Sequence, residues 1–401
     1  MHRILIILFI VLLAACESKE PEPLRQDAEG SPEIPWQRPD TVITPENVQR
    51  IRIGGELNGH TATVFNVRIS PDGQRVATIG ADKRFVVWNI ASGRSLLISP
   101  EIEVNDVLFL PDRDAVLSIG SDEQLRKWSL LDEQQIKQIT AHEQQISMVT
   151  QSPDGGEVAV GGINGIVKIY NADTLDLISE FVAHSGGFPV VAAYYTPDGS
   201  RLYTQGGEGR ISIWNPETGD ELGQLEEGQP TPLGSAQSPD KTLLAVVRGE
   251  RVNIYNLLTG ERTTTFEIPP FDAVEDLQFS ADNLWLAIGG NIDNVTIFDI
   301  TTGDLVVALR GHGRSFLSMA FSQDKSMILT GVAGGDAFLW NLSELATIPS
   351  TSSADQIQIP RAALQQVPGL ELNELEWSPD STYILLVGRN GGVHMLSVPG
   401  A

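Results

Sequence analysis

The sequence predicts an all-β protein that repeats one small antiparallel unit eight times. Glycine and proline, with 38 and 23 copies, together outnumber the 27 lysines and arginines by more than two to one, which favours many short strands joined by turns. A Ser-Pro-Asp-Gly-like tetrapeptide recurs along the chain, and an aromatic residue follows most copies at a fixed distance. Because 41% of the 401 residues are hydrophobic, the chain has enough apolar material for a large core.

The recurring tetrapeptide predicts one tight corner in each unit. Its proline presets φ for a turn and its Asp-Gly completes the turn, so each copy should join two antiparallel strands. The second residues of successive copies lie 40, 42, 44, 42, 42, 42 and 56 positions apart, which is the period of propeller blades. The copies begin at Ser70, Leu110, Ser152, Thr196, Ser238, Ser280, Ser322 and Ser378.

The apolar pattern around each corner predicts three strands. A first strand is expected before the corner, because seven of eight residues at one position there are large and apolar. That position is held by Val64, Val104, Ile146, Val190, Pro232, Val274, Phe316 and Leu372. Segments such as 75–80 and 202–206 predict second strands, and segments such as 85–88 and 211–214 predict third strands after a polar turn.

Seven of the third strands end in an aromatic residue followed by a small polar residue. The aromatic residues are Trp88, Trp128, Tyr170, Trp214, Tyr255, Phe298 and Trp340. With Trp-Asn in place of Trp-Asp, this pattern resembles the WD-repeat family over about residues 48–401. The Gly-His mark that the family carries before the first strand has counterparts at His60, His142, His184 and His312.

The resemblance also implies a buried hydrogen-bonded set in each blade, made of a histidine, a Ser or Thr, an aspartate and the tryptophan. In the first repeat this structural set is His60, Thr78, Asp82 and Trp88. Other repeats depart from it. The second has Ser118, Asp122 and Trp128 without the histidine, and the fourth has His184, Thr204 and Trp214 with Glu208 in the acidic place.

The length of the repeated region predicts an eight-bladed β-propeller of four-stranded antiparallel blades. Residues 47–401 give about 44 residues per blade for eight blades and about 51 for seven, outside the usual range of 40–45. The eighth repeat ends after its third strand, so residues 48–57 should supply its outer strand and close the ring. The longest spacing leaves extra residues between 341 and 371, where 361–366 could form a helical turn.

The N-terminus has the pattern of a signal peptide followed by a tether. Residues 1–15 combine a basic start, an apolar run too short to span a bilayer, and Ala14-Ala15. Leu13 to Cys16 resembles the lipobox of bacterial lipoproteins, which implies cleavage before Cys16 and lipidation of this single cysteine. An ordinary secreted protein is the alternative. Residues 16–46, rich in proline and glutamate, are predicted to be a disordered tether.

Charge and motif content argue against several functions. The formal net charge of -25 disfavours binding of nucleic acid and adhesion of the body of the chain to anionic lipid. Four of the six histidines occupy the structural Gly-His place, and zinc, serine-hydrolase and P-loop motifs are missing from the sequence. We therefore expect no catalytic residues, no metal and no cofactor.

One candidate binding surface follows from the resemblance, because propellers of this family commonly bind partners on the top of the ring, beside the apolar first-strand position. The corresponding residues are Phe65, Asn105, Ser147, Val191, Leu233, Glu275, Leu317 and Asn373. Four are large and apolar at positions expected to be exposed, which predicts a protein-binding patch. Packing of these side chains in the central channel is the alternative.

Together these features predict a membrane-anchored, non-catalytic scaffold for protein–protein interactions in the bacterial cell envelope, expected to be monomeric. Glu17 beside the cysteine is not the Asp that retains many lipoproteins at the inner membrane, which favours the outer membrane, facing the periplasm. A Gram-positive surface is the alternative location. The alternative functions are an accessory lipoprotein of outer-membrane protein assembly and a quinoprotein-like or lactonase-like periplasmic enzyme.

Overall fold

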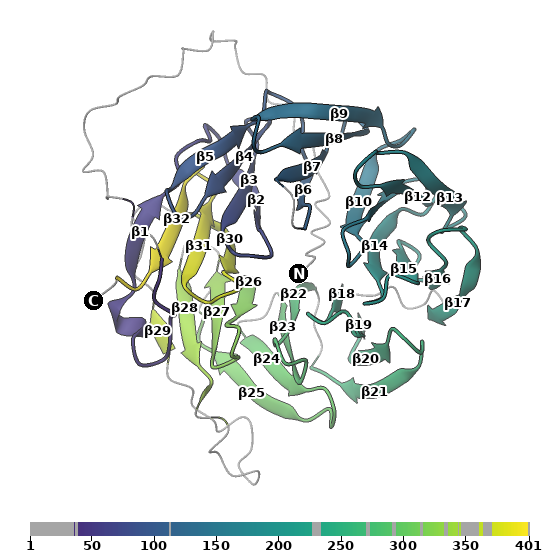
Figure 1. Ribbon diagram of the computed structural model, residues 1–401. Helices are drawn as coiled ribbons and strands as arrows, with labels where there is room; N and C mark the ends of the chain where they lie inside the picture. Colours follow the sequence, from purple (N-terminus) through teal and green to yellow (C-terminus); the bar gives the residue numbers. More distant parts are fainter. Residues whose placement is uncertain are drawn as a thin grey trace, which may run out of the picture.

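Figure 1 shows the computed structural model of the chain, a ring of eight four-stranded sheets. Neighbouring strands in every sheet are antiparallel, so the predicted all-β, eight-bladed propeller is confirmed. The structure describes residues 36, 39–111, 114–226, 234–269, 273–290, 294–312, 316–332, 336–343, 345, 361–363 and 371–399. The first element of the described chain is the 3-10 turn η1 (Val48–Arg50).

Each blade runs from an inner first strand to an outer fourth strand (Figure 1). Blades 1 and 2 are β2 (Val64–Ile69), β3 (Arg75–Gly80), β4 (Arg84–Asn89), β5 (Arg94–Ile98) and β6 (Asp106–Phe109), β7 (Ala115–Ile119), β8 (Gln124–Ser129), β9 (Gln134–Thr140). Blades 3 and 4 are β10 (Ile146–Gln151), β11 (Glu157–Gly162), β12 (Ile166–Asn171), β13 (Leu177–Val182) and β14 (Val190–Tyr195), β15 (Leu202–Gly206), β16 (Ile211–Trp214), β17 (Glu221–Glu226).

The second half of the ring repeats this order. Blades 5 and 6 are β18 (Gly234–Gln237), β19 (Leu243–Arg248), β20 (Arg251–Asn256), β21 (Arg262–Glu267) and β22 (Val274–Phe279), β23 (Trp285–Gly290), β24 (Asn294–Asp299), β25 (Leu305–Arg310). Blade 7 is β26 (Phe316–Phe321), β27 (Met327–Val332), β28 (Ala337–Asn341), β29 (Arg361–Ala363). Blade 8 is β30 (Leu372–Trp377), β31 (Tyr383–Gly388), β32 (Val393–Ser397) and β1 (Arg52–Glu56).

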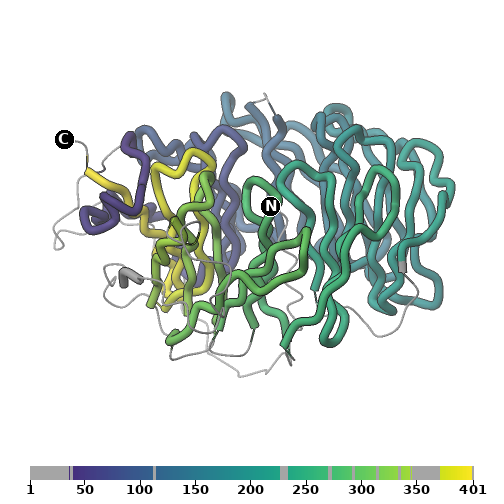
Figure 2. The backbone as a smooth tube through the Cα atoms, turned by 90° about the horizontal axis from the view of Figure 1, so that it is seen from below, coloured from purple at the N-terminus to yellow at the C-terminus, as the bar shows by residue number. Residues whose placement is uncertain are grey.

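The ring has two faces, on which different connections lie (Figure 2). The turns between second and third strands, and the loops from one blade into the next, lie at one end of the strands. We call this end the top face. The turns between first and second strands and between third and fourth strands lie at the other end, the bottom face.

The recurring tetrapeptide forms a bottom turn that is fixed by its first and third side chains. In blade 1, the Ser70 hydroxyl donates to Asp72 Oδ1 over 2.5 Å and accepts the Arg75 amide over 2.9 Å. Asp72 Oδ1 also accepts the Gln74 amide over 3.0 Å. Burial of Asp72 acts against its charge, but these hydrogen bonds hold its pKa below the usual value. Ser or Thr bonds Asp in the same way at residues 152, 196, 238, 280 and 322.

The fourth position of this turn requires a left-handed backbone, which explains the glycine there. Gly73 has φ +69°, and Gly155 and Gly199 are similar. Non-glycine residues take the same conformation in the later blades, where Lys241, Asn283, Lys325 and Ser381 have φ between 54° and 63°. The side-chain hydrogen bonds of the turn therefore keep its shape even where glycine is absent.

The N-terminal strand closes the ring as predicted. β1 pairs antiparallel with β32, with Arg52 opposite Ser397 and Glu56 opposite His394, and takes the place of the outer strand of blade 8. The strand is shorter than the predicted segment 48–57, because residues 48–50 form η1. Pairing of β1 covers an edge of β32 that would otherwise be open.

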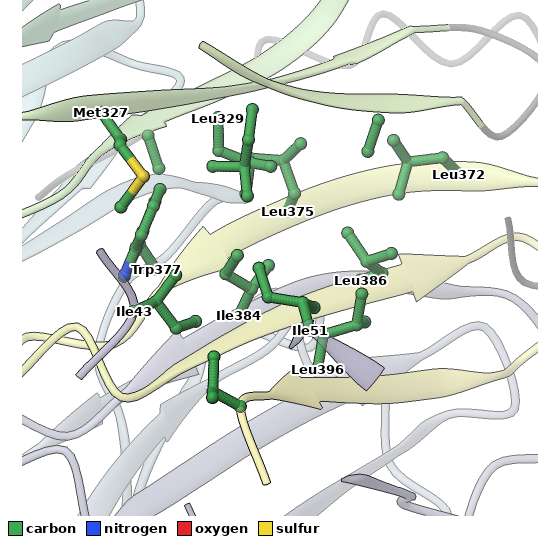
Figure 3. Packing of buried hydrophobic residues seen from close by; sticks show 14 residues of the cluster. Ile43, Ile51, Met327, Leu329, Leu372, Leu375, Trp377, Ile384, Leu386 and Leu396 are labelled. Carbon is green, nitrogen blue, oxygen red and sulfur yellow. The ribbon is translucent and has the colours of Figure 1, made fainter. Parts of the chain in front are cut away.

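Residues ahead of β1 also belong to the ring. Ile43 is buried in the core cluster of blades 7 and 8, beside Trp377 (Figure 3), and its amide donates to the Ser381 carbonyl over 2.8 Å. Trp36 donates from Nε1 to the Ile90 carbonyl over 3.0 Å, and its ring lies where a Cβ on Gly55 or Gly93 would have to be. Trp36 and Ile43 are therefore among the described residues that pack against the ring.

Two other predictions concern regions that the structure describes only in part. Arg361–Ala363, expected in a helical turn, is instead β29, the outer strand of blade 7, which pairs with β28. Cys16, the predicted signal peptide 1–15 and the tether up to residue 35 lie outside the described residues. Within the described part of the chain, no helix is both long and apolar enough to cross a bilayer.

Candidate interaction surface

The positions predicted to bind partners share a backbone feature that the sequence did not reveal. In blade 1, Val64 pairs with Gly80 and Asn66 pairs with Ile79, so Phe65 is the extra residue of a β-bulge. The register shifts in the same way around Ser147, Val191, Glu275, Leu317 and Asn373. Such bulges bend a strand and re-aim a side chain near the rim of a sheet. Asn105 lies just before β6, and Leu233 lies outside the described residues.

Two of these side chains join neighbouring blades. The Ser147 hydroxyl donates to the Val190 carbonyl of blade 4 over 2.7 Å, and Asn373 Nδ2 donates to the Val64 carbonyl of blade 1 over 3.3 Å. In both cases the acceptor is the apolar first-strand residue of the next blade. The polar groups of Ser147 and Asn373 therefore form hydrogen bonds between blades of the ring.

The expected exposure of the apolar members is corrected by the structure. Phe65, Val191 and Leu317 are half-buried, and Phe65 packs against the core cluster between blades 1 and 2. The bulge at Phe65 directs the side chain partly into the seam between blades 1 and 2, which explains its partial burial. Glu275 is exposed, whereas Asn105, Ser147 and Asn373 are half-buried.

Two exposed apolar residues lie in loops of the top face, Phe188 and Ile163, and the sequence prediction missed both. Phe188, 43% exposed, lies in the loop that leads into blade 4, and Ile163, 41% exposed, lies in the second-to-third-strand turn of blade 3. The two loops pack together, since a Cβ on Gly165 would lie 1.9 Å from the His184 carbonyl oxygen and 2.8 Å from that of Phe188. The patch of Ile163 and Phe188 is called the apolar knob below.

An insertion in blade 4 creates the apolar knob. His60, His142 and His312 stand four positions ahead of their first strands, but His184 stands six ahead of Val190. The loop contains Gly186 and Gly187, both with left-handed φ, and a Cβ on Gly187 would meet no atom within 4 Å. The sequence signal was available, because the distance from histidine to aromatic residue is 30 here and 28 in the other three repeats.

The structure brings together the four residues of the hydrogen-bonded set in blade 1. His60 Nδ1 lies 3.0 Å from Asp82 Oδ1, and its Nε2 lies 2.9 Å from Thr78 Oγ1. Trp88 Nε1 donates to the same Thr78 hydroxyl oxygen over 2.9 Å. The set ties the top loop to the second and third strands, so it helps to position the top face.

Blade 4 forms the same set with glutamate in the acidic place. His184 Nδ1 lies 2.7 Å from Glu208 Oε1, its Nε2 lies 3.0 Å from Thr204 Oγ1, and Trp214 Nε1 donates to Thr204 over 2.9 Å. Burial lowers the pKa of His184 below the ordinary value although Glu208 opposes this shift. The imidazole that supports the loop of the apolar knob is thus held neutral.

In blade 7, His312 Nε2 lies 3.0 Å from Thr330 Oγ1 and Trp340 Nε1 donates to the same hydroxyl over 2.8 Å, whereas the sets of blades 2 and 3 are incomplete. Trp128 Nε1 donates to Ser118 over 2.8 Å in blade 2, where Asp122 instead pairs with Arg126. In blade 3, His142 Nε2 lies 3.3 Å from the Ile166 carbonyl, and its Nδ1 has no hydrogen-bond partner among the described residues. Burial lowers the pKa of His142.

Charged residues of the inner strands join blades around the channel. Arg68 of blade 1 donates to both carboxylate oxygens of Asp106 in blade 2, over 3.1 and 3.0 Å. Burial opposes the charge of Arg68, but Asp106 keeps its pKa above the ordinary value. Asp276 accepts the Met319 amide of the next blade over 2.9 Å, and Glu374 accepts the Val67 amide over 3.1 Å. In the described part of the chain, no three His, Cys, Asp or Glu side chains are grouped so that they could hold a metal ion.

Comparison with known families identifies the repeated unit. The family model described as "WD domain, G-beta repeat" matches residues 52–89, 133–171 and 303–341. Three segments of the chain therefore match the WD40 repeat. Each matched segment begins near the outer strand of one blade and ends with the third strand of the next, so a WD40 repeat is offset by one strand from a blade. This offset makes β1 both the first strand of the first repeat and the last strand of blade 8.

The relatives that the chain matches are proteins of different kinds, and some are much longer than this chain. The chain is 24% identical over 298 residues to apoptotic protease-activating factor 1 of Rattus norvegicus, covering 74% of this chain but 23% of the relative. It is 23% identical over 252 residues to the guanine nucleotide-binding protein subunit beta of Zea mays, covering 58% of this chain and 66% of the relative. The chain therefore spans less than two thirds of both.

Solved structures share the fold. The C-terminal WD40 domain of Sif2 matches with a TM-score of 0.71 at 13% identity, covering 87% of this chain and 99% of that structure. The computationally designed Ika8 protein matches with a TM-score of 0.65 at 21% identity, covering 86% of this chain and 98% of that structure. At these identities the similarity concerns the fold alone.

Proposed function

We propose that this WD40-repeat propeller is a membrane-anchored, non-catalytic scaffold of the bacterial cell envelope that binds a protein partner through the top of blades 3 and 4. The apolar knob is the observation that carries the proposal. Two large apolar side chains are exposed in two top loops, and Gly165 of one loop approaches the backbone of the other closely. Exposed apolar residues grouped on a face of a soluble domain are typical of protein-binding sites.

The surroundings of the knob support a preformed site. The loop of Phe188 is held from below by the His184, Thr204 and Trp214 set, and the Gly207 amide donates to the Pro189 carbonyl over 2.9 Å. A surface fixed in this way loses little conformational entropy when a partner binds. The non-catalytic part of the proposal is supported by the histidines, which are buried and engaged in structural hydrogen bonds in blades 1 and 4.

The envelope part of the proposal is supported by the sequence before the ring. Leu13 to Cys16 resembles a lipobox, and a lipid on Cys16 would hold the acidic body of the protein at a membrane that it would not otherwise adhere to. Glu17 favours the outer membrane over the inner one.

Changing Cys16→Ser should move the full chain from the membrane fraction to the soluble fraction. The single cysteine is the only thiol available for lipidation, and its loss should also abolish incorporation of a labelled fatty acid. We expect the ring to melt at the same temperature, because the substitution precedes every described residue of the ring in the sequence. Unchanged membrane retention with unchanged lipid labelling would contradict the anchor.

Changing Phe188→Ala should weaken partner binding by about 30-fold, since an apolar side chain at an interface centre often contributes about 2 kcal/mol. The matched control is Leu258→Ala, because Leu258 is 44% exposed in a bottom turn. The partner is first identified by photo-crosslinking from position 163 in the native envelope, and its affinity is then measured with purified protein. Equal affinity of both variants, with equal melting temperatures, would remove the apolar knob from the site.

A further inference from the structure

Residues 36–57, which we call the strap, cross the ring from the bottom face to the top face. Trp36 bonds Ile90 in a bottom turn of blade 1, and Ile43 bonds Ser381 in a bottom turn of blade 8. β1 then starts at the bottom, opposite Ser397, and ends near the top, opposite His394. The chain therefore reaches the ring at its bottom face, at the seam between the last and first blades.

The lower end of the strap is fixed at several points. The Trp36 ring packs against the core cluster between blades 8 and 1, and glycines at 55 and 93 make room for it. Ile43 and Ile51 are buried in the cluster between blades 7 and 8. Arg50 donates to the Pro399 carbonyl over 3.0 Å. A pull on the chain before residue 36 would act first on Trp36 and its contacts with the bottom turn of blade 1 and with Gly55 of β1.

We propose that the strap sets the orientation of the ring at a lipid surface, with the bottom face toward the lipid and the top face, with the apolar knob, away from it. This proposal rests on the proposed lipid anchor at Cys16. It deepens the scaffold function, because it leaves the partner-binding face open to the surrounding compartment.

The length of the tether predicted from the sequence supports a restricted orientation. Twenty residues separate the strap from the anchor, counting from Cys16 to residue 35. As a flexible coil they span about 25 Å, and fully extended about 60 Å. A folded domain of some 350 residues has a radius of gyration of about 20 Å. The average reach of the tether is thus close to the radius of the ring, which disfavours turning the top face to the membrane.

Charge on the bottom face keeps the ring from lying flat on anionic lipid. Hydrogen bonds in the bottom turns lower the pKa of Asp72, Asp198, Asp240, Asp282 and Asp324 although burial opposes this. Asp282 pairs with Lys325, and the other four carboxylates are ionised at neutral pH and repel anionic headgroups. At physiological ionic strength this repulsion is screened beyond about 8 Å, a distance shorter than the reach of the tether. The repulsion therefore keeps a gap between the bottom face and the lipid, but it does not turn the ring over.

The test compares fluorescent probes on the two faces of the anchored full chain. A probe is placed by a noncanonical residue at Leu131, which is 75% exposed in a bottom turn, or at Ser185, which is exposed in the top loop of blade 4. The protein is purified with its anchor and reconstituted in vesicles that carry a headgroup-linked quencher. We expect quenching several-fold stronger at position 131 than at position 185.

A strap variant separates orientation from anchoring. Trp36→Ala should free the lower end of the strap and reduce the difference between the two probes, whereas Trp36→Phe, which keeps the ring packing, should preserve most of it. Equal quenching at both positions in the unaltered chain, or stronger quenching at 185, would overturn the orientation while leaving the anchor intact. A chain recovered wholly in the soluble fraction would overturn the anchor and the orientation with it.

Discussion

Deletion of residues 36–57 should prevent the ring from folding as a single cooperative unit. The deletion removes β1 and leaves the edge of β32 unpaired. It also removes Ile43, Ile51 and Leu57, all buried in core clusters. Each such side chain contributes about 1.5–3 kcal/mol when fully buried, so the loss is comparable with the whole stability of about 5–15 kcal/mol expected for a domain.

The measurement is equilibrium unfolding together with light scattering at several protein concentrations. We expect aggregation that grows with concentration, because the open edge of β32 can pair with another chain. The matched control is Arg52→Ala, which changes an exposed side chain of β1 and keeps its backbone pairing. If the shortened chain stays monomeric and melts where the intact one does, β1 does not close the ring.

The blade order could be predicted from the sequence because it depends on local patterns. Each bottom turn repeats one tetrapeptide, and each third strand ends in an aromatic residue, so period and strand order follow directly. Ring closure could also be predicted, because the eighth repeat ends after its third strand and the segment before the first repeat is the one left to supply the fourth. The role of Ser70 was less visible in the sequence. Its hydroxyl donates to Asp72, two residues later, and accepts the amide of Arg75, five residues later.

The candidate site was predicted less well because it depends on contacts between blades. The bulge at Phe65 arises from the register of two strands, and nothing in the local sequence marks the extra residue. The same holds for Ser147 and Asn373, whose side chains bond carbonyl groups of the next blade. Trp36 lies in a proline-rich segment without periodicity, and its pocket is formed by glycines 55 and 93, which are distant in the sequence.

The Thr204 hydroxyl is the centre of the hydrogen-bonded set beneath the apolar knob. Trp214 Nε1 donates to it, and the neutral imidazole of His184 accepts from it at Nε2 while Nδ1 donates to Glu208. His184 and Thr204 are fully buried and Trp214 nearly so. Opposite Thr204 in the paired strand stands Ser212, whose buried hydroxyl oxygen has no hydrogen-bond partner in the described part of the structure. The two hydroxyls are therefore both buried on neighbouring strands, but only that of Thr204 forms hydrogen bonds with described side chains.

Changing Thr204→Val should destabilise the protein by about 2–5 kcal/mol. The substitution keeps the volume of the side chain but leaves Trp214 Nε1 and His184 Nε2 buried without partners, at about 1–3 kcal/mol each. Ser212→Ala is the matched control and should change stability by less than about 1 kcal/mol, because it removes a hydroxyl that makes no hydrogen bond to the described residues. Denaturant unfolding gives both values, and hydrogen exchange of residues 184–190 should increase only in the threonine variant. Equal effects of the two substitutions would show that stability depends on packing at these positions and not on the hydrogen-bonded set.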